Sequence, residues 1–138
     1  MIESRLLQAA IILACFVPLT AGTAGVMWGV DFITRGWPGA DLNSHLRYLS
    51  GILLAIGAAF LTCVPQIERQ GERFRLLGLL VVTGGLTRLL GLVISGPAGT
   101  ARFALTMELV VVPLLLVWQR RIAQRVPSIP GPASAVGR

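Results

Sequence analysis

Four long apolar segments dominate this chain of 138 residues. Residues 6–30 and 48–67 carry no charged side chain, whereas residues 76–101 and 103–119 carry one each. Roughly 20 helical residues cross a membrane hydrocarbon core about 30 Å thick, so each segment is long enough to span it. Because lipid offers no partner to backbone N–H and C=O groups, we expect all four segments to be α-helices.

The composition excludes the soluble classes of protein. Hydrophobic residues make up 54% of the chain and charged residues only 13%, which is too little polar material to cover a water-soluble surface. A soluble enzyme, a nucleic-acid-binding domain and a secreted disulfide scaffold are therefore excluded. Cys15 and Cys63 lie in separate apolar segments, and with a single histidine they form no pattern of metal ligands, so we expect no metal and no cofactor.

These patterns predict an all-α fold, a four-transmembrane-helix antiparallel bundle in one domain over residues 1–126. A small-residue sequence at 20–25 has the composition of a signal-peptide cleavage site, but the apolar run continues beyond it, which favours an uncleaved first span. The Pro-rich tail, residues 127–138, is predicted to be disordered and cytoplasmic. The predicted spans are about 6–30, 45–67, 74–95 and 101–119.

The arginines predict the orientation of the bundle. The net charge of +6 is the balance of 12 arginines, with no lysine, against 6 acidic residues, and most arginines flank one side of the predicted membrane. By the positive-inside rule, both termini and the loop between the second and third spans face the cytoplasm of a bacterial inner membrane, where lipid headgroups are the expected partners. Arginines on that side are Arg5, Arg69, Arg73, Arg75, Arg120, Arg121, Arg125 and Arg138, against Arg35 and Arg102 on the other.

Arg88 and Glu108 interrupt the third and fourth apolar segments at membrane depth. Both lie at similar sequence distances from the turn near residues 97–98, so an antiparallel hairpin brings them to similar depth, where they are expected to pair. Small residues recur at helical spacing in three spans and predict close-contact faces. These faces are Ala21, Gly25 and Gly29; Gly51, Ala55 and Ala59; and Gly84, Gly91 and Ser95.

Two further polar residues begin the second span on the same side of the membrane. His45 and Arg47 lie at that start, so we expect them to join Arg88 and Glu108 in one outward-facing ligand pocket. A structural alternative stays open: the Arg88–Glu108 pair then only fixes the register of two helices, Arg47 reaches the outer headgroups and His45 is interfacial.

Short motifs around these residues resemble a bacterial membrane family known as domain of unknown function 4345. The stretch NSHLRYLSG at 43–51 resembles the opening of its second span, GGLTRLLGLVISG at 84–96 resembles its third, and Glu108 matches the acid of its fourth. Gly91 stands where family members often carry Ser. The likeness covers about residues 6–120 and implies a four-helix integral membrane protein without implying an activity.

Three functions remain open. The first is binding of a small anionic or carbonyl-bearing ligand, such as a lipid headgroup or a quinone, by Arg47 and Arg88, with Glu108 orienting Arg88. The second is a proton-coupled small transporter that uses Glu108, although Arg88 is expected to keep Glu108 ionised. The third is a structural partner that packs in a homo-oligomer or against another membrane protein. No pattern of catalytic residues favours an enzyme.

Overall fold

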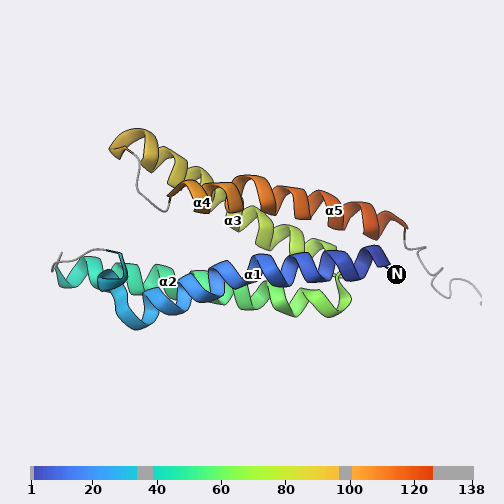
Figure 1. Cartoon of the computed structure of the whole chain (residues 1–138), viewed down its shortest axis with the longest axis horizontal. Helices are drawn as coiled ribbons and strands as arrows, with labels where there is room; N and C mark the ends of the chain where they lie inside the picture. The colour runs from blue at the N-terminus through green and yellow to red at the C-terminus, as the bar shows by residue number, and fades with distance from the viewer. Residues whose placement is uncertain (1, 34–38, 97–100, 126–138) are drawn as a thin grey trace, which may run out of the picture.

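The four apolar segments form four long helices in the computed structural model, which describes residues 2–33, 39–96 and 101–125 (Figure 1). The fourth helix is continuous along its length and consists of two α-helical parts with a π-helical turn between them. The elements are α1 (Ile2–Trp28), the 3₁₀ turn η1 (Gly29–Phe32), α2 (Ala40–Cys63), the 3₁₀ turn η2 (Val64–Gln66), α3 (Gly71–Ser95), α4 (Ala101–Thr106), the π-helical turn η3 (Met107–Val111) and α5 (Val112–Arg125).

All four helices have the length and hydropathy to cross a membrane, which confirms the predicted all-α bundle of four spans. The second helix begins at Ala40, ahead of the predicted start at 45. Asp41 lies in its first turn, where a carboxylate interacts favourably with the positive end of the helix dipole. The polar residues of 40–47 therefore extend the helix instead of ending it. The predicted disordered tail, 127–138, lies outside the described residues.

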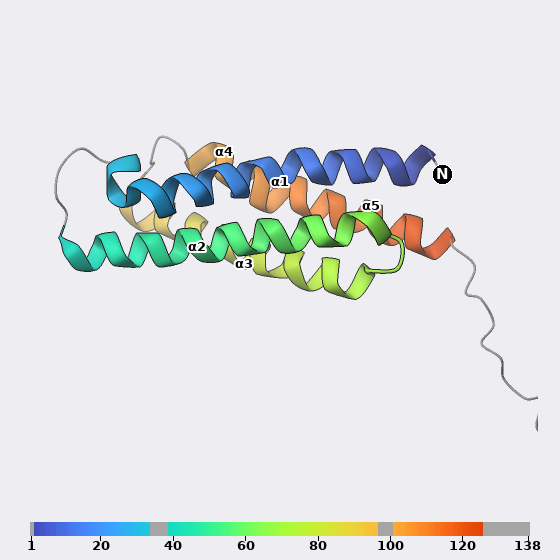
Figure 2. The same cartoon turned by 90° about the horizontal axis from the view of Figure 1, so that it is seen from below.

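The helices pack as two antiparallel hairpins, α1 with α2 and α3 with the fourth helix (Figures 1 and 2). We call the end where α1 begins and α5 ends the proximal end, and the opposite end the distal end. The two hairpins lie close together at the proximal end, and α3 stands apart from α1 and α2 at the distal end (Figure 1). The bundle is thus closed at one end and splayed at the other.

The hydrophobic core lies in the proximal half, where all four helices contribute to it. The rings of Phe60 on α2 and Phe74 on α3 meet edge to face, with centroids 5.3 Å apart. This geometry favours aromatic contact and joins the two hairpins. The buried residues of the core are Leu7, Ile11, Cys15, Phe60, Cys63, Ile67, Phe74, Leu77, Leu115 and Ile122.

Two glutamines hold the connection between α2 and α3 at the proximal end. Gln8 Nε2 donates to the carbonyl of Val64 at 2.8 Å, and the buried Gln119 donates through Nε2 to the carbonyl of Ile67 at 2.9 Å. The last carbonyls of a helix have no partner within the helix, and an unpaired carbonyl is costly away from water. These side chains therefore stabilise the turn between the hairpins.

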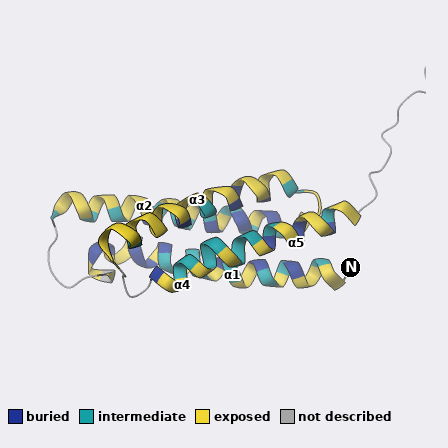
Figure 3. Ribbon diagram, turned by 90° about the horizontal axis from the view of Figure 1, so that it is seen from above, coloured by how far each residue is buried: buried dark blue, intermediate teal, exposed yellow. Residues whose placement is uncertain are grey.

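Much of the outward surface of every helix is apolar and exposed (Figure 3). Leu13 and Phe16 on α1, and Val93 and Ile94 on α3, are each more than two-thirds exposed. A water-soluble protein rarely presents so large an apolar surface, whereas contact with lipid tails requires one. The surface is that of a multi-pass membrane protein.

Close contact between α1 and α2 depends on glycines of α1. A Cβ at Gly22 would lie 2.8 Å from the backbone nitrogen of Leu54, and one at Gly25 would lie 2.7 Å from Ser50 Cβ. The predicted contact face of α1 is therefore confirmed at Gly25. On α2 the prediction is wrong at Gly51, where a Cβ meets nothing within 4 Å, whereas Ala59 packs against the hydrophobic core. The contact face of α2 follows Ser50 and Leu54, one residue earlier in the helix.

Substitution of Gly22 by alanine should destabilise the first hairpin. The new Cβ would meet backbone atoms, which cannot move aside, so we expect Gly22→Ala to lower the unfolding free energy by about 1–3 kcal/mol. Gly51→Ala is the matched control, since it adds the same methyl group to open space and improves helix propensity. Thermal unfolding in mild detergent measures both. Equal melting temperatures for the two variants would contradict this packing.

Candidate functional site

Glu108 lies in the π-helical turn of the fourth helix. The N–H of Val112 donates to the carbonyl of Met107, five residues back, whereas an α-helix would direct it to Glu108. Residue 113 is proline, which has no N–H and whose ring would clash with the carbonyl four residues earlier in a regular helix. A π turn just before Pro113 accommodates that ring, so the sequence itself accounts for the irregularity.

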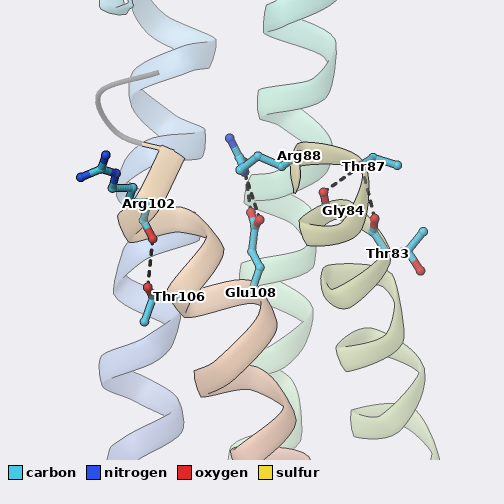
Figure 4. A network of polar contacts seen from close by, with 7 residues as sticks. All are labelled: Thr83, Gly84, Thr87, Arg88, Arg102, Thr106 and Glu108. Atoms are coloured by element: carbon cyan, nitrogen blue, oxygen red, sulfur yellow. Dashed lines mark hydrogen bonds and ion pairs between the residues drawn. The ribbon is translucent and has the colours of Figure 1, made fainter. Parts of the chain in front are cut away.

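Arg88 and Glu108 form a bidentate ion pair between α3 and the fourth helix (Figure 4). Arg88 Nε donates to Glu108 Oε2 at 3.0 Å, and Nη2 donates to Oε1 at 3.0 Å. The two parallel hydrogen bonds fix the orientation of the guanidinium plane. The contact predicted across the second hairpin is present.

Gly85 allows α3 to approach the turn that carries Glu108. A Cβ at Gly85 would lie 2.8 Å from both Glu108 Cβ and Leu109 Cδ2. The predicted contact face of Gly84 and Gly91 is wrong, because a Cβ at either position meets nothing within 4 Å. Gly85 lies about one helical turn before Arg88, so both residues lie on the face of α3 that packs against the fourth helix. The long Arg88 side chain reaches Glu108 from that face.

A cavity of about 140 Å³ lies between the two hairpins, on the proximal side of the ion pair. All four helices line it. Arg88 and Glu108 supply its charged groups, and its other lining residues, within the part of the chain that the structure describes, are apolar. They include Ala14 and Ala21 on α1, Ile56 and Phe60 on α2, Phe74 on α3 and Val111 on the fourth helix.

His45 and Arg47 lie elsewhere. Both are described residues, and neither lines the cavity. Arg47 Nη1 donates to the carbonyls of Val26 and Met27, the latter at 3.2 Å, and so caps the end of α1. His45 is exposed on α2. The structure therefore brings together two of the four predicted ligand residues, because the last carbonyls of α1 engage the Arg47 guanidinium.

Asn43 completes this cap. The backbone N–H of Val30 donates to Asn43 Oδ1 at 3.2 Å, and Gly29, with φ +59°, lies so close that a Cβ would meet Asn43 Oδ1 at 2.1 Å. Only glycine adopts this left-handed conformation without strain. The NSHLR motif thus closes the first hairpin, a structural role that its polar residues did not reveal in the sequence.

The rest of the chemistry near the site is limited. Over residues 2–33, 39–96 and 101–125, no group of three or more His, Cys, Asp or Glu side chains is placed to hold a metal ion. Thr83 donates to the carbonyl of Leu79 on its own helix. Thr87 donates in the same way to the carbonyl of Gly84 (Figure 4). The arrangement at Arg88 and Glu108 can therefore hold a polar group by hydrogen bonds and charge.

The cavity itself was not predicted from the sequence. Its apolar lining belongs to the same helical pattern as the core, so no periodicity distinguishes it. Two signals were present nonetheless: Pro113 inside the fourth apolar segment indicates a helix irregularity next to Glu108, and the alanines at 14 and 21 leave space along α1.

Adjacent glycines on α3 offer a matched test of the ion pair's geometry. We expect Gly85→Ala to push α3 away from Glu108 and to lower the unfolding free energy by about 1–3 kcal/mol. Gly84→Ala adds the same atom one residue away, in open space, and should leave stability unchanged or slightly raised. Thermal unfolding in detergent compares the two variants. A larger loss of stability in Gly84→Ala than in Gly85→Ala would contradict the contact of Gly85 with the fourth helix.

Comparison with known proteins gives the family of the chain. A comparison with curated proteins and one with solved structures each found no significant match. A family model described as Domain of unknown function (DUF4345) matches residues 6–119, which cover most of all four helices and include both members of the ion pair. With most of its length matched, and with four long apolar helices as its fold, the chain belongs to the DUF4345 family.

Proposed function

We propose that this protein binds an amphipathic, lipid-like molecule between its two hairpins. The apolar part of the ligand occupies the cavity, and its polar head lies against the Arg88–Glu108 pair. The observation that carries the proposal is the composition of the cavity wall, which is apolar except for one ion pair at its distal end.

The cavity has the character of a hydrophobic ligand site. Binding sites for small molecules are mainly apolar, with a few polar groups that fix the ligand's orientation. A volume of about 140 Å³ is close to that of an apolar cavity that holds benzene, roughly 150 Å³, so the cavity holds a short segment of an apolar tail and the rest extends into the surrounding lipid. The lining extends along α3 from Phe74 to Arg88, about 21 Å at the rise of an α-helix, which suits a chain better than a disc.

The ion pair supplies the polar end of the site. The Arg88 side chain is 43% exposed, whereas that of Glu108 is 16% exposed. Arg88 therefore presents its guanidinium to a ligand while Glu108 holds it from behind. A charged group at membrane depth is costly and usually marks a functional site, which supports this assignment.

The alternative functions have less support from the geometry. A proton-coupled transporter needs Glu108 to take up a proton, and that step removes the negative charge that strengthens its two hydrogen bonds with Arg88. An assembly role would leave the cavity and its ion pair without a part, although Gly84 and Gly91 are exposed on α3 and available to another helix.

For orientation, we propose that the proximal end faces the cytoplasm of the inner membrane. Exposed arginines gather there on α1, α3 and α5 and just before α3, and positively charged ends of membrane helices are retained on the cytoplasmic side. The ion pair then lies in the outer half of the membrane. The exposed arginines of that end are Arg5, Arg69, Arg73, Arg75, Arg120, Arg121 and Arg125.

Filling the cavity should abolish lipid binding. Ala21→Leu adds three carbons to a cavity-lining position, whereas Ala9→Leu adds them to an exposed position on the same helix. We expect the lipid bound to purified Ala21→Leu to fall at least about tenfold below the wild-type amount, a difference of about 1.4 kcal/mol in binding free energy. Ala9→Leu should bind the wild-type amount.

Native mass spectrometry of protein released from mild detergent counts the bound lipid. Wild type and Ala9→Leu should carry a stoichiometric adduct that Ala21→Leu lacks. An adduct of equal amount in all three proteins would place the lipid outside the cavity and contradict the proposed function.

A further inference from the structure

We infer that the ligand of the interhairpin cavity has an uncharged head that accepts hydrogen bonds, such as a carbonyl, on a long apolar tail. The inference rests on the proposed function and names its substrate class. Of the anionic and carbonyl-bearing ligands that the sequence left open, it keeps the second, because the net positive charge that suited an anion counted Arg47 as part of the site. The structure engages Arg47 at the end of α1 instead.

The charge of the site carries the first step. Among the described residues that line the cavity, Arg88 is the cation and Glu108 is the acid, so the formal charges cancel. An anionic head near Arg88 would also lie near the carboxylate that holds it through two hydrogen bonds. Like charges brought together at a binding site cost several kcal/mol, so an anion is disfavoured there.

A free donor on Arg88 carries the second step. Nε and Nη2 bind Glu108, and Nη1 makes no hydrogen bond within the described part of the chain. In Figure 4 the guanidinium faces Glu108 through two of its nitrogens, and the third nitrogen lies on the side opposite Glu108. A guanidinium donates hydrogen bonds and accepts none, so the group that meets Nη1 must be an acceptor.

The depth of the site carries the third step. Helix α3 has 25 residues and is therefore about 37 Å long, and Arg88 precedes its end at Ser95 by about 10 Å. When a hydrocarbon core of about 30 Å is centred on α3, Arg88 lies inside the core, near its distal edge. Charged headgroups lie outside that core, whereas an uncharged carbonyl enters it at far smaller cost.

A series of ligands with matched tails tests the head directly. Purified protein in mild detergent is titrated with methyl palmitate, hexadecyl sulfate and hexadecane, which carry a neutral carbonyl, a permanent anion and no head. Binding is read from the shift in melting temperature at equal mole fractions in the micelles. We expect methyl palmitate to bind at least about tenfold more tightly than either of the others. A prenylated benzoquinone in the same assay separates an ester-bearing lipid from a quinone as the source of the carbonyl.

The Glu108→Gln variant sharpens the test, since it keeps the shape of the side chain and removes its charge. The site then carries the Arg88 charge alone, and we expect the preference to reverse, with hexadecyl sulfate binding at least about tenfold more tightly than methyl palmitate. Arg102→Gln is the control: Arg102 lies on the same helix but outside the cavity lining, so the wild-type preference should persist.

The outcomes separate this inference from the proposed function. If hexadecyl sulfate equals or exceeds methyl palmitate on wild type, the uncharged head is wrong and the cavity remains a lipid site. If hexadecane binds as well as methyl palmitate, the donor on Arg88 plays no part and the inference fails. If none of the probes shifts the melting temperature, the proposed function itself fails. Should Glu108→Gln not fold, the wild-type series alone decides.

Discussion

The ion pair between Arg88 and Glu108 is the interaction on which the organisation of the second hairpin depends. A lone guanidinium or carboxylate at membrane depth is costly, and each side chain reduces that cost for the other through two hydrogen bonds. The pair in turn requires a close approach of α3 to the fourth helix, which Gly85 permits. It also requires Glu108 to face α3, and the π turn ahead of Pro113 sets that direction.

The cavity follows from an uneven distribution of packing between the two ends of the bundle. At the proximal end, large apolar side chains and the hydrogen bonds of two glutamines join all four helices. Toward the distal end, glycines hold α1 against α2, and the ion pair holds α3 against the fourth helix. Each hairpin is therefore closed on itself at the distal end, and the space between the hairpins stays open as an apolar cavity.

Much of this architecture could be predicted from the sequence, because lipid forces long apolar segments into helices and isolates charges that must pair. The contact between Arg88 and Glu108 could be predicted because the two residues lie at similar depth in the membrane. The contact faces of α2 and α3 could not be predicted so well, since small residues occur at adjacent positions such as Gly84 and Gly85, and a shift of one residue turns a helix by about 100°. The position of Arg47 at the end of α1 could not be predicted, because a charged residue that caps a neighbouring helix and one that binds a ligand look alike in a sequence.

A double-mutant cycle on the ion pair tests the central claim most directly. Arg88→Leu and Glu108→Leu each leave one unpaired charge inside the membrane, and each should lower the unfolding free energy in lipid bicelles by about 3 kcal/mol. The double variant removes both charges, so we predict that it is more stable than either single variant. If the two losses instead add in the double variant, the two side chains do not interact within the membrane, and the polar end of the cavity is not the one described.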